Sequence, residues 1–177
     1  IERHAFGVLI VAAPDGARDG VTDAAHIPFV LDRTSGSCGT LRAHVARANP
    51  IWQAFDGKTE ALAIFSGPDA YISPDWYQAL HQVPTWNYIA VHARGRPRIV
   101  AEDSGVRGLL DDLSAVNEAR LVGKKPWTIA KMPAELYARM TQAIVAFDMP
   151  IERIEGKWKL SQNRAAADRA GVIAALE

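Results

Sequence analysis

The chain has 177 residues, of which 49% are hydrophobic and 23% charged, which is the composition of a soluble globular protein with a sizeable core. Its 20 basic and 20 acidic residues cancel, so net charge gives no reason to expect nucleic acid or an anionic membrane as a partner. No apolar run approaches the ~20 residues of a membrane span, and the single Cys38 forms no internal disulfide. We expect one cytoplasmic domain over residues 1–177, with further natural residues before Ile1 because the chain does not begin with Met.

Short strands joined by turns are predicted over the first half of the chain. Continuous or alternating apolar runs indicate strands at 6–13, 20–31, 38–44, 61–65 and 88–95. The strand at 20–31 is expected to lie antiparallel to the first, across a turn at residues 14–16. Asn49-Pro50 favours a turn, after which a short helix is predicted as far as Phe55.

Helices are predicted mainly in the second half. The apolar spacing within residues 104–118 is that of one helix face, and Pro133 opens a second helix through residue 140. A strand at 143–149 is expected to continue through 151–160. Ser161 or Asn163 is then predicted to cap a last helix that ends at Leu176. Short antiparallel strands with late helices predict an α+β fold that is mainly β, or a β-barrel, rather than a parallel sheet.

Residues 65–88 form an unusually aromatic and rigid stretch. They contain two of the five Trp, three of the four Tyr and three of the ten Pro. Pro68, Pro74 and Pro84 predict a break into a short strand at 70–73, a turn or helix start at 73–76, and a second strand entered at 83–88. Two interpretations stay open. The aromatic side chains line a pocket for a flat ligand, or they anchor a loop to the core.

Polar side chains gather at three predicted strand ends. The first group, Arg42, His44, Arg47 and Asn49, suits a phosphate, and its alternative is a solvated turn. The second group is Trp86, Asn87 and Tyr88, where an amide between two aromatic rings can bond the edge of a heterocycle or simply begin a strand. The third group is Lys159, Ser161, Gln162, Asn163 and Arg164, whose alternative is a helix cap.

Together these groups favour a flat, anionic, heteroaromatic ligand such as flavin mononucleotide (FMN). The sequence contains no motif for a catalytic nucleophile, a P-loop or a dinucleotide-binding glycine loop, and no zinc-ligand spacing. We therefore predict no catalytic side chain and no metal site.

Several blocks of the sequence resemble the PaiB family, described as FMN-binding negative transcriptional regulators. The blocks are residues 47–52 (RANPIW), 65–77 (FSGPDAYISPDWY), 83–88 (VPTWNY) and 159–164 (KLSQNR), with HIP at 26–28 on the second predicted strand. The resemblance extends from Phe6 to about Asn163, which is nearly the whole chain.

The resemblance implies a split β-barrel of the flavin-reductase and pyridoxamine-phosphate-oxidase type, with inserted and C-terminal helices. It also implies a homodimer with FMN at the subunit interface. Residues 44–49 would hold the phosphate, and the ring would be read from Asn87 onward and by 159–164. The predicted cofactor-binding residues are His26, Arg42, His44, Arg47, Asn49, Trp86, Asn87, Tyr88, Lys159, Ser161 and Arg164.

Three functions remain open at this point. The first is an FMN-binding regulator, for which DNA is expected only through the resemblance, since no helix-turn-helix with a basic recognition helix is recognisable. The second is a flavin-dependent oxidoreductase, in which FMN supplies the redox chemistry. The third is a sensing domain for another aromatic anion, haem or pyridoxal phosphate, with His26, His44 or His92 as the candidate haem ligand.

Overall fold

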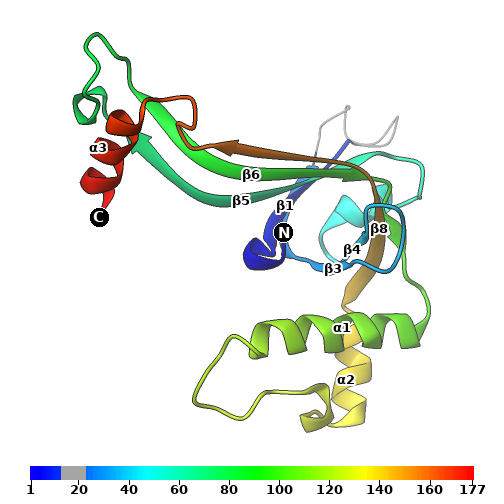
Figure 1. Ribbon diagram of the computed structural model, residues 1–177. Helices are drawn as coiled ribbons and strands as arrows, with labels where there is room; N and C mark the ends of the chain where they lie inside the picture. The colour runs from blue at the N-terminus through cyan, green and yellow to red at the C-terminus, as the bar shows by residue number, and fades with distance from the viewer. Residues whose placement is uncertain (13–22) are drawn as a thin grey trace. The chain divides into compact units, whose positions relative to one another are not determined.

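The computed structural model of the protein describes residues 1–12 and 23–177 (Figure 1). The strands are β1 (Phe6–Val11), β2 (Asp23–Pro28), β3 (Val30–Asp32), β4 (Thr40–Ala46), β5 (Ala61–Ile72), β6 (Thr85–Gly95), β7 (Arg98–Ile99) and β8 (Ile144–Lys159). The α-helices are α1 (Asp103–Glu118), α2 (Ala134–Thr141) and α3 (Ala166–Leu176). Short 3-10 helices are η1 (Glu2–His4), η3 (Pro50–Ala54), η4 (Pro74–Trp76) and η5 (Ile129–Lys131).

The strands form an eight-stranded sheet in the order β2-β1-β5-β6-β8-β4-β3, with β7 paired to β8. The recorded registers are antiparallel, including the predicted pairing of β1 with β2, in which Val8 faces His26. This mainly β arrangement with three α-helices confirms the predicted α+β fold class. No helix among the described residues has both the length and the apolar character needed to cross a lipid bilayer.

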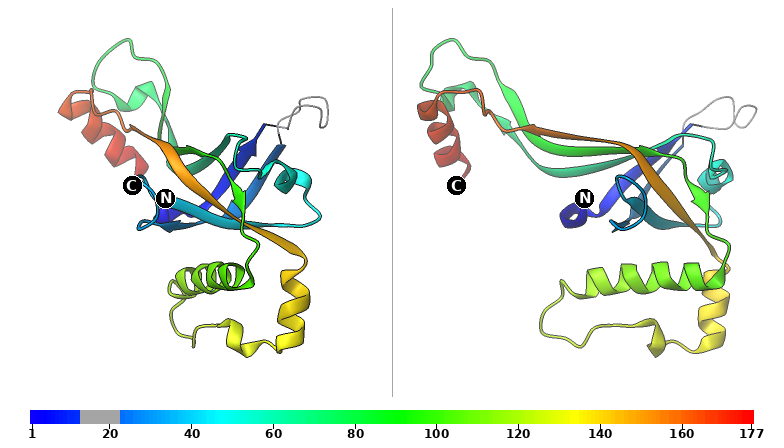
Figure 2. Two further views of the ribbon diagram at one scale, coloured as in Figure 1. Left: turned by 90° about the vertical axis from the view of Figure 1, so that its right-hand side faces the viewer. Right: turned by 45° about the vertical axis from the view of Figure 1, so that its right-hand side comes forward.

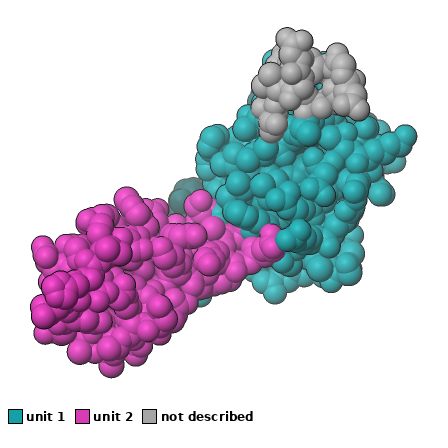
Figure 3. Space-filling view, turned by 90° about the horizontal axis from the view of Figure 1, so that it is seen from above, with its two compact units in different colours: residues 1–65, 92–154 teal, residues 66–91, 155–177 magenta. Residues whose placement is uncertain are grey.

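The chain groups into two compact units, coloured separately in Figure 3. Unit 1 comprises residues 1–65 and 92–154, and unit 2 comprises residues 66–91 and 155–177. Three long strands, β5, β6 and β8, contribute residues to both. Each unit has its own buried side chains and is described by itself below.

The core of unit 1 is built from strand residues that alternate between its two faces. On β4, Leu41, Ala43 and Val45 are buried in the core, while Arg42 and His44 point to the other face. Phenylalanines fill the centre of the core. Phe29 meets Phe65 edge-on with ring centroids 5.2 Å apart, and Phe55 lies 4.4 Å from Phe147. Such aromatic pairs add directional contacts to the burial of apolar area.

The outer face of this part of the sheet is covered by α1, and α2 lies on the same side (Figures 1 and 2). The predicted helical stripe explains the contact, because Leu109 and Leu113 of α1 pack on Ala146 of β8. Helix α2 is tied to α1 by the Arg107 guanidinium, which lies 5.4 Å from the ring centroid of Tyr137.

The core of unit 2 is small and lies between α3 and the strand end that precedes η4. Ile72, Tyr77 and Val172 are buried together, with Ala70 and Trp76 packed around them. The aromatic stretch predicted from residues 65–88 therefore does anchor itself locally. As predicted, Ser73 caps η4, because its Oγ accepts a hydrogen bond from the Asp75 N–H at 3.3 Å.

Three predictions about the elements need correction. The strand expected at 20–31 is divided at Phe29 into β2 and β3, while residues 20–22, the predicted turn at 14–16 and the end of the strand expected at 6–13 lie outside the described residues. The predicted break at Pro68 was wrong, because β5 continues to Ile72. The recorded pairing of β1 with β5 covers only residues 61–64, so Pro68 removes no donor from that ladder. Neither Ser161 nor Asn163 caps α3, whose N-cap is Ala165.

Candidate functional site

Several hydrogen bonds brace the turn that follows β4 in unit 1. The Arg47 guanidinium donates hydrogen bonds to the carbonyl oxygens of Gln142 (2.8 Å) and Ile144 (2.9 Å), which fixes it against the start of β8. Trp52 Nε1 donates back to the Arg47 carbonyl oxygen at 2.9 Å, and the guanidinium lies 5.9 Å from the Trp52 ring centroid. Asn49 Oδ1 accepts from the Ile51 N–H at 3.1 Å and caps η3. The block RANPIW is thus a self-bracing turn that presents one arginine.

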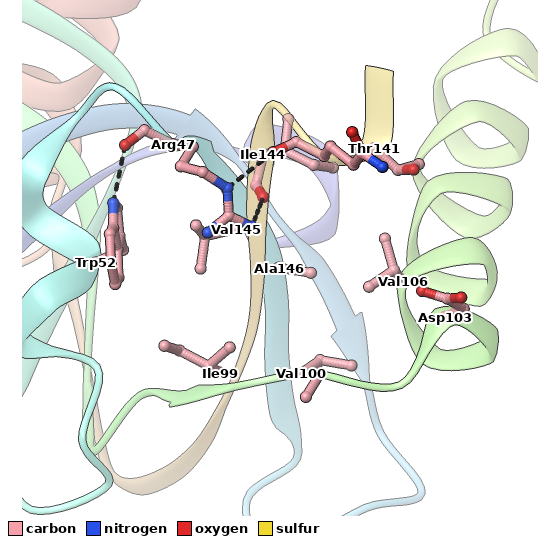
Figure 4. Close-up of a pocket in the computed structure, with 12 residues that line it drawn as sticks. Arg47, Trp52, Ile99, Val100, Asp103, Val106, Thr141, Ile144, Val145 and Ala146 are labelled. Carbon is pink, nitrogen blue, oxygen red and sulfur yellow. Dashed lines mark hydrogen bonds between the residues drawn. The ribbon is translucent and has the colours of Figure 1, made fainter. Parts of the chain in front are cut away.

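This arginine stands at the edge of a pocket of about 340 Å³. Figure 4 shows Arg47 and Trp52 on one side of the pocket and Asp103 with Val106 on the other. The floor between them is formed by residues 99–101 and 144–146. The pocket therefore has a cationic end and an anionic end with an apolar floor. A volume of this size lies within the range of small-molecule and cofactor sites.

Arg42 is not part of this pocket, although the sequence groups it with Arg47. Its Nη1 donates to Asp112 of α1 at 2.7 Å, and its Nε donates to Asp148 of β8 at 3.4 Å. These two carboxylates offset the charge of Arg42 and join α1 to the sheet. In this structure Arg42 works as a structural clamp.

His44 lines a separate pocket, beneath α1 and α2. Its Nδ1 is buried and has no hydrogen-bond partner among the described residues. Burial lowers the pKa of the imidazole, which keeps it neutral at physiological pH. His26 lies elsewhere again, exposed on β2 with its ring 6.4 Å from that of Phe6. The structure therefore does not bring His26, Arg42 and His44 together around Arg47.

In unit 2 the structure joins two of the predicted polar groups. Ser161 Oγ donates to Asn87 Oδ1 at 2.9 Å, and Lys159 Nζ donates to Thr85 Oγ1 at 2.7 Å. The bond with Ser161 involves Oδ1 of Asn87 and not its N–H₂ group. The block KLSQNR is thus a turn held against the start of β6, with Ser161 in a left-handed conformation at φ 59°.

Arg164 belongs to the same network, although through partners that the sequence did not indicate. Its guanidinium donates to Gln82 Oε1 and lies 4.6 Å from the ring centroid of Tyr77. Asp168, another residue that sequence reasoning missed, is buried and accepts from the N–H groups of Gln78 (2.8 Å) and Ala79. Only its burial reveals its importance, since nothing in the local sequence distinguishes it from an exposed helical aspartate.

Trp86 and Tyr88 alternate with Asn87 along β6, so they lie on the other face of the strand. Trp86 is 53% exposed and meets Tyr71 edge-on, with ring centroids 5.9 Å apart. Trp158 is equally exposed, and its ring lies over Gly156, where an added Cβ would stand 2.1 Å from it. The glycine is therefore needed to let the indole lie close to the strand.

Comparisons with known proteins identify the chain. The family described as "Putative FMN-binding domain" matches residues 1–153. A curated relative, the protease synthase and sporulation protein PAI 2 of Bacillus subtilis, is 30% identical over 100% of this chain and 81% of its own length. The chain belongs to the PaiB family of FMN-binding domains. An uncharacterized protein of Emericella nidulans is 31% identical over 87% of this chain and 74% of its own length.

Solved structures confirm the split-barrel fold of this FMN-binding chain. An FAD- and heme-binding protein of Mycobacterium smegmatis superposes with a TM-score of 0.60 at 18% identity, covering 98% of this chain and 74% of that chain. The flavocytochrome Anf3 of Azotobacter vinelandii gives a TM-score of 0.57 at 13% identity, covering 96% of this chain and 70% of that chain. At these identities the likeness concerns the fold alone.

The donor set around Arg47 fits one part of FMN. FMN ends in a phosphate, and a planar guanidinium fork is the side chain best suited to bind phosphate oxygens. Arg47 carries five N–H donors, and its bonds to the carbonyl oxygens of Gln142 and Ile144 use Nε and Nη2. The fork is thus fixed in place and retains donors for an anion. The opposite end of the pocket, at Asp103, disfavours a second anionic group.

Proposed function

We propose that this PaiB-family chain is an FMN-dependent regulatory protein in which Arg47 holds the phosphate of the cofactor. The observation that carries this proposal is the guanidinium fixed at the edge of the 340 Å³ pocket by the carbonyl oxygens of Gln142 and Ile144. A donor held in advance loses little conformational freedom on binding, which raises affinity. The relative in Bacillus subtilis carries sporulation in its name, and this favours regulation over metabolism.

Bound FMN supplies a ring that gains and loses electrons, and this chain need only bind and orient it. In unit 1, Arg47 supplies charge and Trp52 an indole surface at the pocket edge. In unit 2, Ser161 orients the Asn87 amide and Thr85 accepts from the Lys159 ammonium, and both Asn87 and Lys159 remain predicted cofactor ligands. Six further residues remain predicted cofactor ligands, namely His26, Arg42, Asn49, Trp86, Tyr88 and Arg164.

An FMN titration tests the proposed phosphate site. We expect Arg47→Ala to weaken FMN binding by about tenfold to a hundredfold, which corresponds to the loss of charge-assisted hydrogen bonds worth about 1.5–3 kcal/mol. Arg33→Ala is the matched control, because Arg33 pairs with Glu2 on the surface and lines neither pocket. Thermal unfolding of each apo variant separates lost binding from lost folding. Equal FMN affinity of the folded Arg47→Ala variant and the wild type would remove Arg47 from the site.

A cationic surface segment supports the regulatory part of the proposal. Residues 119–133 contain Arg120, Lys124, Lys125 and Lys131 and no acidic residue, although the whole chain is neutral. Lys124 is paired with Glu118, while Lys125 is exposed. A local cluster of positive charge is the electrostatic requirement for contact with DNA phosphates.

DNA binding is tested with FMN-loaded protein and promoter DNA from the host genome, with random DNA as the competitor. We expect a shift that weakens with salt, and we expect Lys125→Glu to weaken it while the exposed control Lys58→Glu does not. NAD(P)H oxidation above the free-FMN background, without any DNA shift, would contradict the regulatory function. That outcome favours the flavin-dependent oxidoreductase.

A homodimer is part of the same proposal. Tyr71, Trp86 and Trp158 of unit 2, together called its aromatic face, are each about half exposed, and Tyr71 meets Trp86 edge-on. Large aromatic side chains gathered on an otherwise polar surface are typical of protein interfaces. A second copy of the chain is the partner that we propose for this aromatic face.

A further inference from the structure

We propose that the pocket of unit 1 that contains His44 binds a small, uncharged ring compound bearing a hydroxyl group, a ligand distinct from FMN. The pocket has a volume of about 200 Å³ and lies where β4, α1, η5, α2 and the start of β8 meet. Its lining includes His44, Leu110, Ser114, Trp127, Ile129 and Met140.

Size and lining define the ligand class. An apolar cavity of about 150 Å³ in an engineered protein holds one benzene molecule, so about 200 Å³ accommodates one aromatic ring with a substituent. None of the described residues that line the pocket is Lys, Arg, Asp or Glu. A charged ligand would therefore lose its hydration without gaining a counter-charge, which excludes the phosphate end of FMN.

His44 defines the polar group of the ligand. His44 lines the pocket, and its Nδ1 is buried without a hydrogen-bond partner among the described residues. Buried polar atoms in native proteins nearly always have such a partner. A hydroxyl group both donates and accepts, so it can bond Nδ1 in either tautomer of the neutral imidazole. This gives His44 a ligand other than the FMN phosphate that the sequence predicted for it.

The chain holds one wall of the pocket in place by a specific contact. Glu118, at the end of α1, accepts hydrogen bonds from Lys124 and from the Trp127 N–H, the latter at 2.7 Å, and so fixes the segment that carries Trp127 and leads to Ile129. Trp127 and Met140 remain 37% and 55% exposed, so the pocket opens to solvent beside them. A ligand can therefore enter without unfolding of α1.

Phenol and toluene are the probes, since they share a ring and differ in the hydroxyl group. Ligand-detected NMR titrations on FMN-loaded protein are expected to show saturable binding of both, with phenol bound about tenfold more tightly for one satisfied buried hydrogen bond. His44→Leu is expected to remove the preference for phenol and to leave toluene binding unchanged. Leu110→Trp fills the pocket and should abolish binding of both probes.

Val116→Trp is the matched control on the same helix, because Val116 is exposed and does not line the pocket. The proposal is overturned if phenol binding does not saturate, if phenol and toluene bind equally to the wild type, or if Leu110→Trp still binds phenol. Should Leu110→Trp fail to fold, the phenol preference in His44→Leu decides alone. Failure of FMN binding in Arg47→Ala has no bearing on these outcomes, so the two proposals are separable.

Discussion

At the scale of single residues, His44 makes the stability of the protein depend on pH. Burial lowers its pKa below the ordinary value of 6.5, so the folded protein holds it neutral where the unfolded chain takes up a proton. Unfolding is therefore favoured as the pH falls below 6.5, and above that pH the group contributes nothing. The slope from one such group is at most about 1.4 kcal/mol per pH unit.

Urea unfolding at about pH 7.5 and about pH 5.5, on either side of the histidine range, tests this dependence. We expect the wild type to lose more stability between the two pH values than the His44→Leu variant does. The residues described as lining the pocket include no other group that titrates in this window. Parallel pH profiles of the two proteins would contradict a depressed pKa of His44.

Asn49 offers a second residue-scale prediction. The sequence suggested a phosphate ligand, whereas in the structure its side chain caps η3. Asn49→Ala is expected to lower the free energy of unfolding by about 1 kcal/mol, and Asn49→Asp, which retains a capping oxygen, by much less. Urea unfolding provides the measurement. If FMN affinity falls in Asn49→Asp without any change in stability, the ligand interpretation is favoured over the cap.

From the sequence alone, the polar residues that make specific contacts could be identified at these positions, but the groups that they contact could not. It indicated Arg42 and Arg47 equally as phosphate ligands, because both are arginines beside one strand end. The structure separates them, since Arg42 meets Asp112 and Asp148, which lie 70 and 106 positions away in the chain. No local pattern encodes such distant pairings, so only the folded chain shows which guanidinium is already neutralised.

At the scale of elements, replacing a glycine by alanine is expected to have opposite effects on stability in α3 and in α1. An added Cβ at Gly171 would lie 2.2 Å from the carbonyl oxygen of Trp76, whereas at Gly108 its nearest contact is Arg42 Nη2 at 3.9 Å. Because Ala is favoured over Gly inside a helix by about 1 kcal/mol, Gly108→Ala should stabilise the protein. Gly171→Ala should destabilise it despite the same propensity gain, since α3 must move away from η4.

Thermal unfolding of the two variants, with circular dichroism as the probe, measures this difference. A rise in melting temperature for both variants would mean that α3 is not held against η4 as closely as the structure has it. The comparison is internal, because both substitutions make the same chemical change within an α-helix. It therefore isolates the packing of α3 from intrinsic helix preference.

Element types followed well from the sequence, but element lengths did not. Alternating apolar residues predicted β4 and β6, and the helical stripe predicted α1 within one residue at its start. Pro68 was interpreted as a strand break, yet β5 passes through it. Proline excludes a residue only from a position where its N–H would be paired, and the sequence does not show which positions of a strand are paired. The predicted cap of α3 was also wrong, because the hydroxyl group of Ser161 donates a hydrogen bond to Asn87 Oδ1 instead.

At the scale of the whole molecule, the aromatic face of unit 2 bears on assembly. One side of the β5 end packs on α3 through Ile72, so the residues that alternate with it point away from the helix. Tyr71 is one of these residues, and it contacts Trp86. A serine or lysine would be the usual choice for a face that remains in water. Large aromatic residues are instead typical of the positions that contribute most of the binding energy of protein interfaces.

We therefore expect the wild type to sediment as a dimer at micromolar concentration and the double variant Trp86→Ser/Trp158→Ser as a monomer. Truncation of a central interface tryptophan typically costs about 2 kcal/mol or more, which weakens association at least about thirtyfold. Leu176→Ser is the matched control, since Leu176 is equally exposed but lies on α3. If FMN binds at the interface, the monomeric double variant also binds FMN more weakly, although neither tryptophan needs to touch the cofactor. A double variant that remains dimeric with unchanged FMN affinity would place the interface on another surface of the chain.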